Sequence, residues 1–296
     1  MSKRPRLLVL GATGPQQRPV AERLLAEGFP VRLLVRDVAA ASALARRGAE
    51  VVAGDLGDAA SVRRAMAGVE GVSLFVPFMN PRPEFGHHVL DAARAAGVRR
   101  IVWNPTGAVP PGKTGHPGMD LRFELQQALA SSDFDAVTIE PTAYLENFLM
   151  PALVEELKTK HTFAYPMPPT SAMQWVCHDD VAQFVVKAFQ TPTLKRATVA
   201  VCGPERLTGD DIAERLSRGL GRTIRFRSMP PREFGEVLDR AMGPGTGERV
   251  VGFYEGLLAA PERFSSNVDL AAALERLPIT PTTVEAWSRK LAALLT

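Results

Sequence analysis

The glycine-rich segment Gly11-Ala12-Thr13-Gly14 carries the clearest chemical signal in the sequence. It directly follows a short apolar run, Leu7 to Leu10, that is typical of a buried strand, and it directly precedes a helical pattern. Glycines at such a turn let the backbone approach a pyrophosphate, which then lies on the helix N-terminus where N–H groups point outward. We therefore predict a dinucleotide site whose phosphates are bound by Gly11, Thr13, Gly14, Pro15 and Gln16; a plain tight turn is the alternative.

The residues that follow the second and third predicted strands bear on which dinucleotide is bound. An acidic residue after the strand Val31 to Val35 would hold the ribose hydroxyls of NAD, but this chain has Arg36 there. A guanidinium suits the 2′-phosphate of NADP because it forms paired charged hydrogen bonds, so we predict NADP(H) as cofactor; an ordinary solvent-facing arginine is the alternative. Asp55 and Leu56 lie where an adenine ring would rest, although Asp55 could equally be a turn residue.

The nicotinamide half of the site is expected where the fourth and sixth strands end, because ligands bind at the carboxyl ends of parallel strands. Pro77 and Phe78 follow the fourth strand and would line the pocket, although phenylalanine is more often a core residue. Pro141 and Thr142 follow the strand Ala136 to Ile139 and would border the nicotinamide.

Further side chains are candidates for contact with a substrate. His116 lies in a Gly/Pro-rich loop over residues 105–118 and could serve as an acid or a substrate contact; a surface histidine is the equal alternative. His178, just before a helix start at Asp179, is a second candidate for a substrate contact. An aromatic wall beside the nicotinamide, or else core packing, is predicted for Tyr144, Asn147, Phe148 and Trp175.

The elements that must position these residues alternate between strands and helices through the first 140 residues. The predicted strands are Leu7 to Leu10, Val31 to Val35, Val51 to Ala53, Val72 to Val76, Arg100 to Trp103 and Ala136 to Ile139. Strands separated by helices form right-handed βαβ units, so the pattern predicts an α/β fold, a doubly wound parallel sheet with helices on both faces.

The second half of the chain has a different pattern. Residues 142–175 are expected to be irregular, because Pro151 and the prolines near Pro168 would break a long helix. Helices dominate from Leu207 onward, and Thr208 to Asp211 and Thr282 to Glu285 have the spacing of capping boxes. We predict a dinucleotide-binding domain of residues 1–140 plus 176–203 and a smaller substrate-binding lobe of residues 141–175 plus 204–296.

Composition excludes several classes of protein. The chain has 296 residues, of which 46% are hydrophobic, but no apolar run reaches the ~20 residues that a bilayer crossing needs, so no membrane association is expected. The net charge is only +3 and the cationic residues are scattered, which argues against nucleic-acid binding. Cys177 and Cys202 cannot form a disulfide framework, and no histidine pair has metal-ligand spacing. We expect a cytoplasmic, metal-free monomer or homodimer.

Several longer segments resemble the NmrA-like group of atypical short-chain dehydrogenase/reductases. They are Gly11 to Gly14, Val31 to Asp37, Gly54 to Leu56, Glu140 to Phe148 and Pro281 to Trp287. The resemblance covers essentially the whole chain and is most specific in the first loop and around residues 140–148. It implies a Rossmann domain with a small C-terminal substrate lobe and NADP(H) as cofactor. It also implies either reduction of small aromatic or quinone-like compounds or a cofactor-sensing regulatory role, and family membership alone does not decide between them.

Two departures from the family pattern bear on function. Gln17 occupies the place of the third glycine in the G-x-x-G-x-x-G loop, which implies a local rearrangement because that glycine permits close helix–strand contact. In related enzymes a lysine on the helix before the sixth strand often touches the nicotinamide ribose, and the matching position here is Arg122. Arginine keeps the charge and donates hydrogen bonds but cannot shuttle a proton at neutral pH, so cofactor binding survives this change better than lysine-dependent chemistry.

None of the tyrosines has the lysine four residues later that lowers the phenol pKa in standard short-chain dehydrogenases. The residues at that spacing are Phe148 after Tyr144, Pro169 after Tyr165 and Leu258 after Tyr254. We therefore predict an NADPH-dependent reductase of quinones, enones or aromatic carbonyl compounds, whose catalytic residues are His116, Arg122 and Tyr144. A non-catalytic NADP(H) sensor with a protein partner is the rival, and a non-redox use of the fold is a third possibility.

Overall fold

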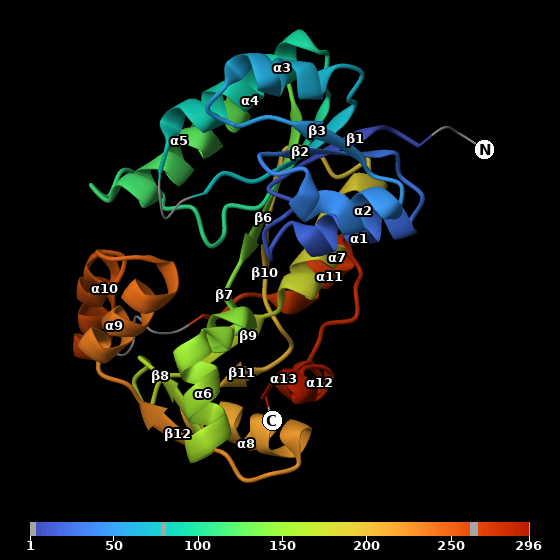
Figure 1. The fold of residues 1–296 in the computed structure, drawn as a ribbon. Coiled ribbons are helices and arrows are strands. Elements are labelled where there is room, and N and C mark those ends of the chain that lie inside the picture. Colours follow the sequence, from blue (N-terminus) through green and yellow to red (C-terminus); the bar gives the residue numbers. More distant parts are fainter. Residues whose placement is uncertain (1–3, 78–80, 261–265, 296) are drawn as a thin grey trace. The chain divides into compact units, whose positions relative to one another are not determined.

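The structure is a computed structural model that describes residues 4–77, 81–260 and 266–295 (Figure 1). The chain divides into two compact units. The first comprises residues 1–141, 178–201 and 271–279, and the second comprises residues 142–177, 202–270 and 280–296. The segment 271–279 therefore belongs to the first unit, although the sequence pattern assigned it to the second lobe. Its helix is tied there because Arg276 donates a hydrogen bond to the carbonyl of Thr198.

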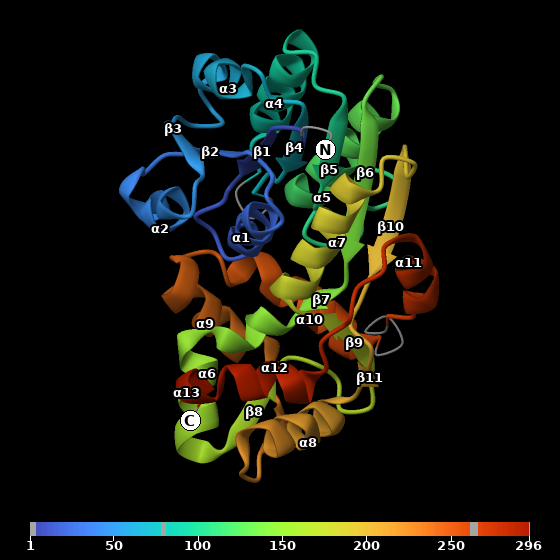
Figure 2. The ribbon, with the colours of Figure 1, turned by 90° about the vertical axis from the view of Figure 1, so that its right-hand side faces the viewer.

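Seven parallel strands form the sheet of the first unit, in the order β10-β6-β5-β4-β1-β2-β3 (Figure 2). This is the predicted doubly wound Rossmann-like sheet. The strands are β1 (Leu7–Leu10), β2 (Val31–Val35), β3 (Glu50–Ala53), β4 (Gly71–Leu74), β5 (Arg100–Trp103), β6 (Asp135–Pro141) and β10 (Ala197–Val201). The strand order reverses between β1 and β4, since Leu7 lies opposite both Val31 and Gly71. A crevice for a ligand opens at such a reversal, at the carboxyl ends of the strands.

Helices cover both faces of this sheet. They are α1 (Arg18–Ala26), η1 (Ala39–Ala41), α2 (Ser42–Arg46), α3 (Ala59–Met66), α4 (Pro83–Ala95), α5 (Pro117–Ala130), α7 (His178–Gln190) and α11 (Leu270–Arg276). One face packs an apolar cluster that includes Val62, Val89 and Leu125 from α3, α4 and α5. On the opposite face α1 lies beside α7 (Figure 2), and Arg23 binds the Asp179 carboxylate with two hydrogen bonds of 2.8 and 2.5 Å.

Prolines begin helices in places where the sequence pattern predicted loops. The helix α5 starts at Pro117, which shortens the predicted 105–118 loop. The helix α6 starts at Pro151 inside the stretch predicted to be irregular, so that prediction is wrong. Proline is well suited to the first helical position because its fixed φ is helical and its missing N–H has no helical partner there.

The second unit combines two small sheets with helices. Its elements are β7 (Ala143–Tyr144), η2 (Leu145–Leu149), α6 (Pro151–Lys160), β8 (Thr162–Tyr165), β9 (Met173–Val176), β11 (Arg206–Leu207), α8 (Gly209–Leu220), β12 (Arg225–Ser228), α9 (Pro231–Met242), α10 (Glu248–Ala259), α12 (Val284–Lys290) and α13 (Ala292–Leu295). Strand β9 pairs with β7 and β11, and β8 pairs with β12.

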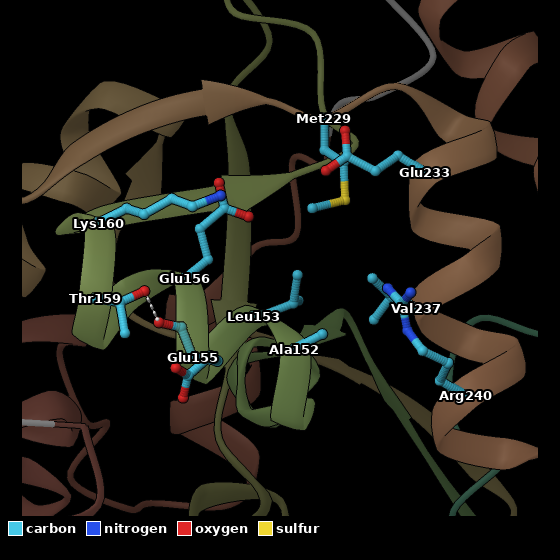
Figure 3. Close-up of a pocket in the computed structure, with 10 residues that line it drawn as sticks. All are labelled: Ala152, Leu153, Glu155, Glu156, Thr159, Lys160, Met229, Glu233, Val237 and Arg240. Atoms are coloured by element: carbon cyan, nitrogen blue, oxygen red, sulfur yellow. Dashed lines mark hydrogen bonds between the residues drawn. The ribbon is translucent and has the colours of Figure 1, made fainter.

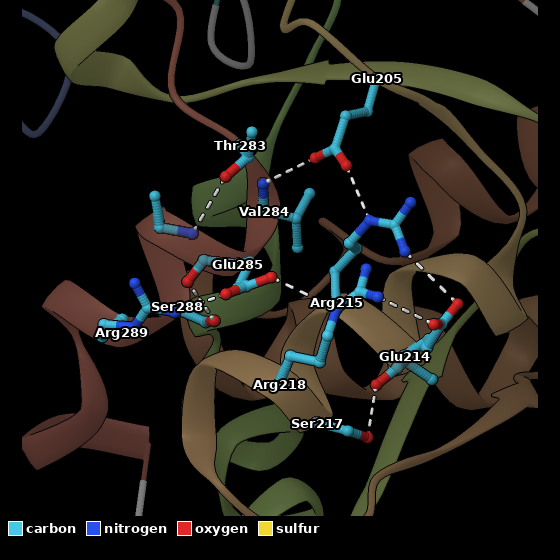
Figure 4. Close-up of polar contacts among 12 residues, drawn as sticks. Glu205, Glu214, Arg215, Ser217, Arg218, Thr283, Val284, Glu285, Ser288 and Arg289 are labelled. Carbon is cyan, nitrogen blue, oxygen red and sulfur yellow. Dashed lines mark hydrogen bonds and ion pairs between the residues drawn. The ribbon is translucent and has the colours of Figure 1, made fainter.

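Charged side chains join α12 to α8 within this unit (Figure 4). Glu205 accepts a 2.7 Å hydrogen bond from Arg215 and also accepts the backbone N–H of Val284, the first residue of α12. The N-cap of α12 is Thr283, whose hydroxyl accepts from Ala286. The capping box predicted from Thr282 to Glu285 is therefore wrong, because the helix begins one residue later and Ala286 cannot return the hydrogen bond. The box from Thr208 to Asp211 at the start of α8 is confirmed.

Candidate functional site

The loop between β1 and α1 forms a tight turn that requires glycine. Gly11 has a φ of +74°, and a Cβ placed there would lie 3.0 Å from the ring of Phe75. The N–H of Gly14 donates to the Gly11 carbonyl over 2.9 Å, and a Cβ at Gly14 would lie 3.3 Å from that oxygen. The backbone therefore turns directly into the N-terminus of α1 with no side chain on the glycines, which is the form needed for close approach of a phosphate.

Gln17 fills the space beneath this loop. Its side chain is buried, and its Oε1 accepts a 2.8 Å hydrogen bond from the Ser73 hydroxyl on β4. The Gln17 Nε2 is buried with no hydrogen-bond partner among the described residues. The bulk of a glutamine is thus accommodated by a polar contact with the neighbouring strand, and Pro19 fits in the first turn of α1.

Arg36 and Asp55 lie together where β2 and β3 end. The Arg36 side chain is 84% exposed, and its Nε is 3.9 Å from an Asp55 carboxylate oxygen. The other Asp55 oxygen accepts from the Gly57 N–H over 2.7 Å, so this carboxylate is also a turn residue before α3. The carbonyl of Leu56 is bonded to the His88 ring at 2.8 Å. An exposed guanidinium beside a fixed carboxylate can bind a phosphate, although the two anions then compete for it.

A polar bridge between the β1 and β5 loops was not predicted from the sequence. Asn104 is buried directly after β5, and its amide donates to Gln16 Oε1 over 3.3 Å. The Thr106 hydroxyl donates to the same Gln16 oxygen over 3.3 Å, and its N–H donates to Asn104 Oδ1 over 2.8 Å. The available signal was the position of two polar residues immediately after a buried strand, which is where parallel sheets bind ligands.

Arg122 and Glu140 form hydrogen bonds with the backbone of the segment that follows Asn104. Arg122 is 8% exposed, and its guanidinium donates to the carbonyls of Thr106 and Ala108 over 3.1 and 3.4 Å. Glu140, near the end of β6, accepts the Val109 N–H over 3.3 Å. Burial raises the pKa of the Glu140 carboxyl, opposed by that hydrogen bond and by the nearby Arg122 charge.

The remaining predicted residues of the first unit lie at the ends of different elements. Pro141 is buried and pairs with Val201 at the end of β6, whereas Pro77 is exposed and Phe78 lies outside the described residues. His116 is exposed at the N-cap of α5 and makes no side-chain capping bond. His178 is the first residue of α7, and burial lowers its pKa from 6.5 to about 4, which keeps its ring neutral at pH 7.

Most predicted residues of the second unit pack in its core. The Phe148 ring lies 4.6 Å from the Phe163 ring and 4.7 Å from the Trp175 ring, centroid to centroid, and both Phe148 and Trp175 are buried. Tyr144 is buried as well. The core-packing alternative therefore describes the positions of Phe148 and Trp175 in this unit. The Trp175 Nε1 is buried with no partner among the described residues.

Two polar side chains of this unit interrupt its apolar surroundings. The Thr142 hydroxyl is buried without a hydrogen-bond partner among the described residues. Asn147 is bonded to the Tyr165 hydroxyl, which in turn lies 3.0 Å from the Tyr254 hydroxyl. These contacts connect Asn147 to Tyr254 of α10 through the Tyr165 hydroxyl.

A hollow of about 170 Å³ lies between α6 and α9 in the second unit (Figure 3). Its floor includes Leu153 and Val237, and its rim carries charged side chains from both helices (Figure 3). The carboxylates of Glu156 and Glu233 each accept two hydrogen bonds from Arg227, so one guanidinium is shared between the two carboxylates. We assign no ligand to this hollow.

The described residues contain no group of three or more His, Cys, Asp or Glu side chains arranged to hold a metal ion. In that same part of the chain no helix has both the length and the apolar composition that a membrane span requires.

Comparisons with known proteins support the fold described above. The model of the NmrA-like family matches residues 3–287. An NAD(P)H azoreductase from Xenophilus azovorans is 29% identical over 220 residues, 74% of this chain and 76% of the relative. The NADPH complex of the quinone oxidoreductase QOR2 from Escherichia coli has a TM-score of 0.76 at 23% identity, covering 96% of this chain and 98% of that one. NmrA, a negative transcriptional regulator solved with NADP, has a TM-score of 0.75 at 18% identity, covering 99% and 97%.

Proposed function

The chain belongs to the NmrA-like family, and from this we propose that it is an NADPH-dependent reductase that transfers hydride to a small quinone, enone or aromatic carbonyl compound. The observation that carries the proposal is the carboxyl edge of the first unit's sheet. There a glycine turn, an exposed Arg36 and the Gln16–Asn104–Thr106 bridge follow β1, β2 and β5. The azoreductase relative uses NAD(P)H, which supports the same class of chemistry.

The cofactor is NADP(H), and the residues present fit it. The turn from Gly11 to Gly14 leaves no Cβ between the backbone and a pyrophosphate at the N-terminus of α1. Arg36 would bind the 2′-phosphate, and Asp55 and Leu56 would border the adenine. The reduced nicotinamide supplies the hydride, and Pro141 and Thr142 would border the ring.

The acceptor class follows from the chemistry that the chain lacks. A plain ketone that accepts hydride becomes an alkoxide and needs a well-placed strong acid, which the missing Tyr–Lys pair would supply. A quinone or enone spreads the incoming charge over oxygen and ring, so hydrogen bonds or water suffice. The rate then depends mainly on how the acceptor is held, which is a matter of proximity and orientation. We propose His116 and His178 of the first unit, and Tyr144 and Asn147 of the second unit, as candidates for acceptor contact. Phe148 and Trp175 pack in the core of the second unit.

The decisive experiment is stopped-flow oxidation of bound NADPH with a panel of quinones, enones and matched saturated ketones. We expect turnover with conjugated acceptors and at least ~100-fold slower turnover with saturated ketones, since ~2.7 kcal/mol of charge delocalisation would be lost. Turnover of saturated ketones at equal rates would contradict the proposed acceptor class.

Arg36 gives a separate prediction about cofactor preference. Wild type is expected to prefer NADPH over NADH, and Arg36→Asp to weaken NADPH binding about tenfold because an exposed charged contact of ~1.4 kcal/mol is lost. NADH binding should change little. The matched control is Arg63→Asp, which makes the same charge change in the last turn of α3. Titration of both cofactors tests this, and an NADH preference in wild type would show the assignment to be wrong.

A cofactor sensor is the second candidate. The observations that favour it are the missing Tyr–Lys pair and the likeness in fold to NmrA, which is a transcriptional regulator. A sensor would bind NADPH without oxidising it in the presence of any acceptor of the panel, and it would bind a protein partner only in one cofactor state. Those two results together would replace the reductase proposal.

A further inference from the structure

We propose that Arg122 and Glu140 are positioning residues that brace the segment 104–109, so that Asn104 and Thr106 are preorganised for the nicotinamide half of the cofactor. This inference rests on the proposed function for its purpose, but the brace itself is a property of the protein without cofactor. In this proposal Arg122 acts by holding the segment 104–109 in place. The family pattern instead predicted that Arg122 contacts the nicotinamide ribose directly.

The donors of Arg122 point into the segment. Its two terminal nitrogens donate to the carbonyls of Thr106 and Ala108, and Nη1 is also 3.4 Å from the Met119 sulfur. The guanidinium is buried under Gly107, where an added Cβ would lie 3.1 Å from Nη1. A planar guanidinium can bond two carbonyls at once with fixed geometry, whereas a lysine ammonium cannot reproduce that arrangement.

Glu140 holds the other end of the same segment. Its Oε1 accepts the Val109 N–H, and it lies close enough to Arg122 for the two charges to interact. Arg122 therefore binds two carbonyls of the segment, and Glu140 binds the N–H of Val109 at its end. Both residues come from rigid elements, α5 and β6, which keeps the intervening loop in one conformation.

The braced segment contains a residue in a strained conformation. Thr106 has a φ of +65°, which β-branched residues rarely adopt. In this conformation its N–H and hydroxyl reach Asn104 and Gln16, which joins the segment to the dinucleotide loop. Backbone strain of this kind persists only where surrounding contacts over-determine it, and the Arg122 and Glu140 bonds are those contacts.

The position of the segment tells which half of the cofactor it serves. Strand β5 lies on the β4 side of β1, whereas Arg36 and Asp55 follow β2 and β3 on the other side. A fault in the brace should therefore weaken binding of the nicotinamide half and leave the adenosine half unaffected.

The test combines Arg122→Lys, Glu140→Ala and Glu140→Gln with hydrogen exchange of the protein without cofactor. Arg122→Lys and Glu140→Ala should each speed exchange of the Thr106 and Val109 amides at least tenfold. Glu140→Gln keeps an acceptor for the Val109 N–H, so it should restore exchange to within about twofold of wild type. Lys113→Ala is the control, because Lys113 lies in the neighbouring loop and the change removes only its exposed ion pair with Glu124 of α5.

Binding measurements distinguish positioning from general damage. Arg122→Lys and Glu140→Ala should weaken NADPH binding about tenfold while leaving the affinity for 2′,5′-ADP, which lacks the nicotinamide half, within about twofold. Unchanged exchange in both variants would overturn the brace, whatever the cofactor. Retained NADPH affinity in Arg122→Lys with loss in Arg122→Ala would indicate direct contact by charge and would also overturn it. Failure of wild type to bind NADPH would refute the proposed function but leave the exchange result interpretable.

Discussion

Replacing Gly11 by alanine is expected to weaken NADPH binding about 100-fold, a loss of roughly 2.7 kcal/mol. The backbone at Gly11 has a φ of +74°, which costs an L-residue roughly 1–2 kcal/mol. In addition, the new methyl group would lie 3.0 Å from the Phe75 ring, so the ring or the loop must shift. We expect the two effects together to displace the backbone that a pyrophosphate would approach. Isothermal titration with NADPH measures the loss.

Gly28→Ala is the matched control for this substitution. Gly28 follows the opposite end of α1 with a φ of +75°, and no atom lies within 4 Å of the position its Cβ would take. Its backbone cost is therefore the same as at Gly11, but the change is away from the carboxyl edge of the sheet. Gly28→Ala should lower stability by ~1 kcal/mol and leave NADPH affinity within about twofold. Equal losses of affinity in the two variants would mean that Gly11 acts through stability alone.

The parallel sheet could be predicted because its signals are local. Each of its strands in the first 140 residues contains a short, mainly apolar run such as Leu7 to Leu10, bounded by residues that end strands. The helix α6 could not be predicted from Pro151. A proline at the first position of a helix and a proline that breaks a helix cannot be told apart unless the start of the helix is already known. The difference depends on where the chain turns, which is a tertiary property.

The candidate site was less predictable than the fold because its contacts join distant parts of the chain. Gln16 and Thr106 are 90 residues apart, and nothing in their local sequence indicates that they share a hydrogen bond. Arg122 and Glu140 likewise meet around one loop from a helix and a strand. For Phe148 and Trp175, sequence spacing cannot distinguish a ligand wall from a core, since both require aromatic side chains. Polar residues directly after strands were the usable signal, and extending it to Asn104 would have found the bridge.

Replacing Gly247 by alanine is expected to lower the free energy of unfolding by about 3 kcal/mol or more, the largest loss of stability among these substitutions. Gly247 is the N-cap of α10, and a Cβ there would lie 2.0 Å from the Gly235 carbonyl oxygen on α9. Its φ of −62° and ψ of −45° are helical, so the backbone itself tolerates alanine and the whole cost comes from the overlap. The two helices can only relieve it by separating. Urea unfolding followed by circular dichroism measures the loss.

Gly252→Ala provides the opposite result within the same helix. No atom lies within 4 Å of the position its Cβ would take, so alanine should stabilise α10 by ~0.5–1 kcal/mol through reduced entropy of the unfolded chain. The contrast also reaches the candidate site, because α10 carries Tyr254, whose hydroxyl is 3.0 Å from that of Tyr165, the partner of Asn147. Separation of α9 and α10 should therefore disturb Asn147 and lower acceptor turnover in Gly247→Ala but not in Gly252→Ala. If Gly247→Ala is as stable as wild type, the close crossing of the two helices is contradicted. If stability falls but turnover is unchanged, the position of Asn147 does not depend on the packing of α9 against α10.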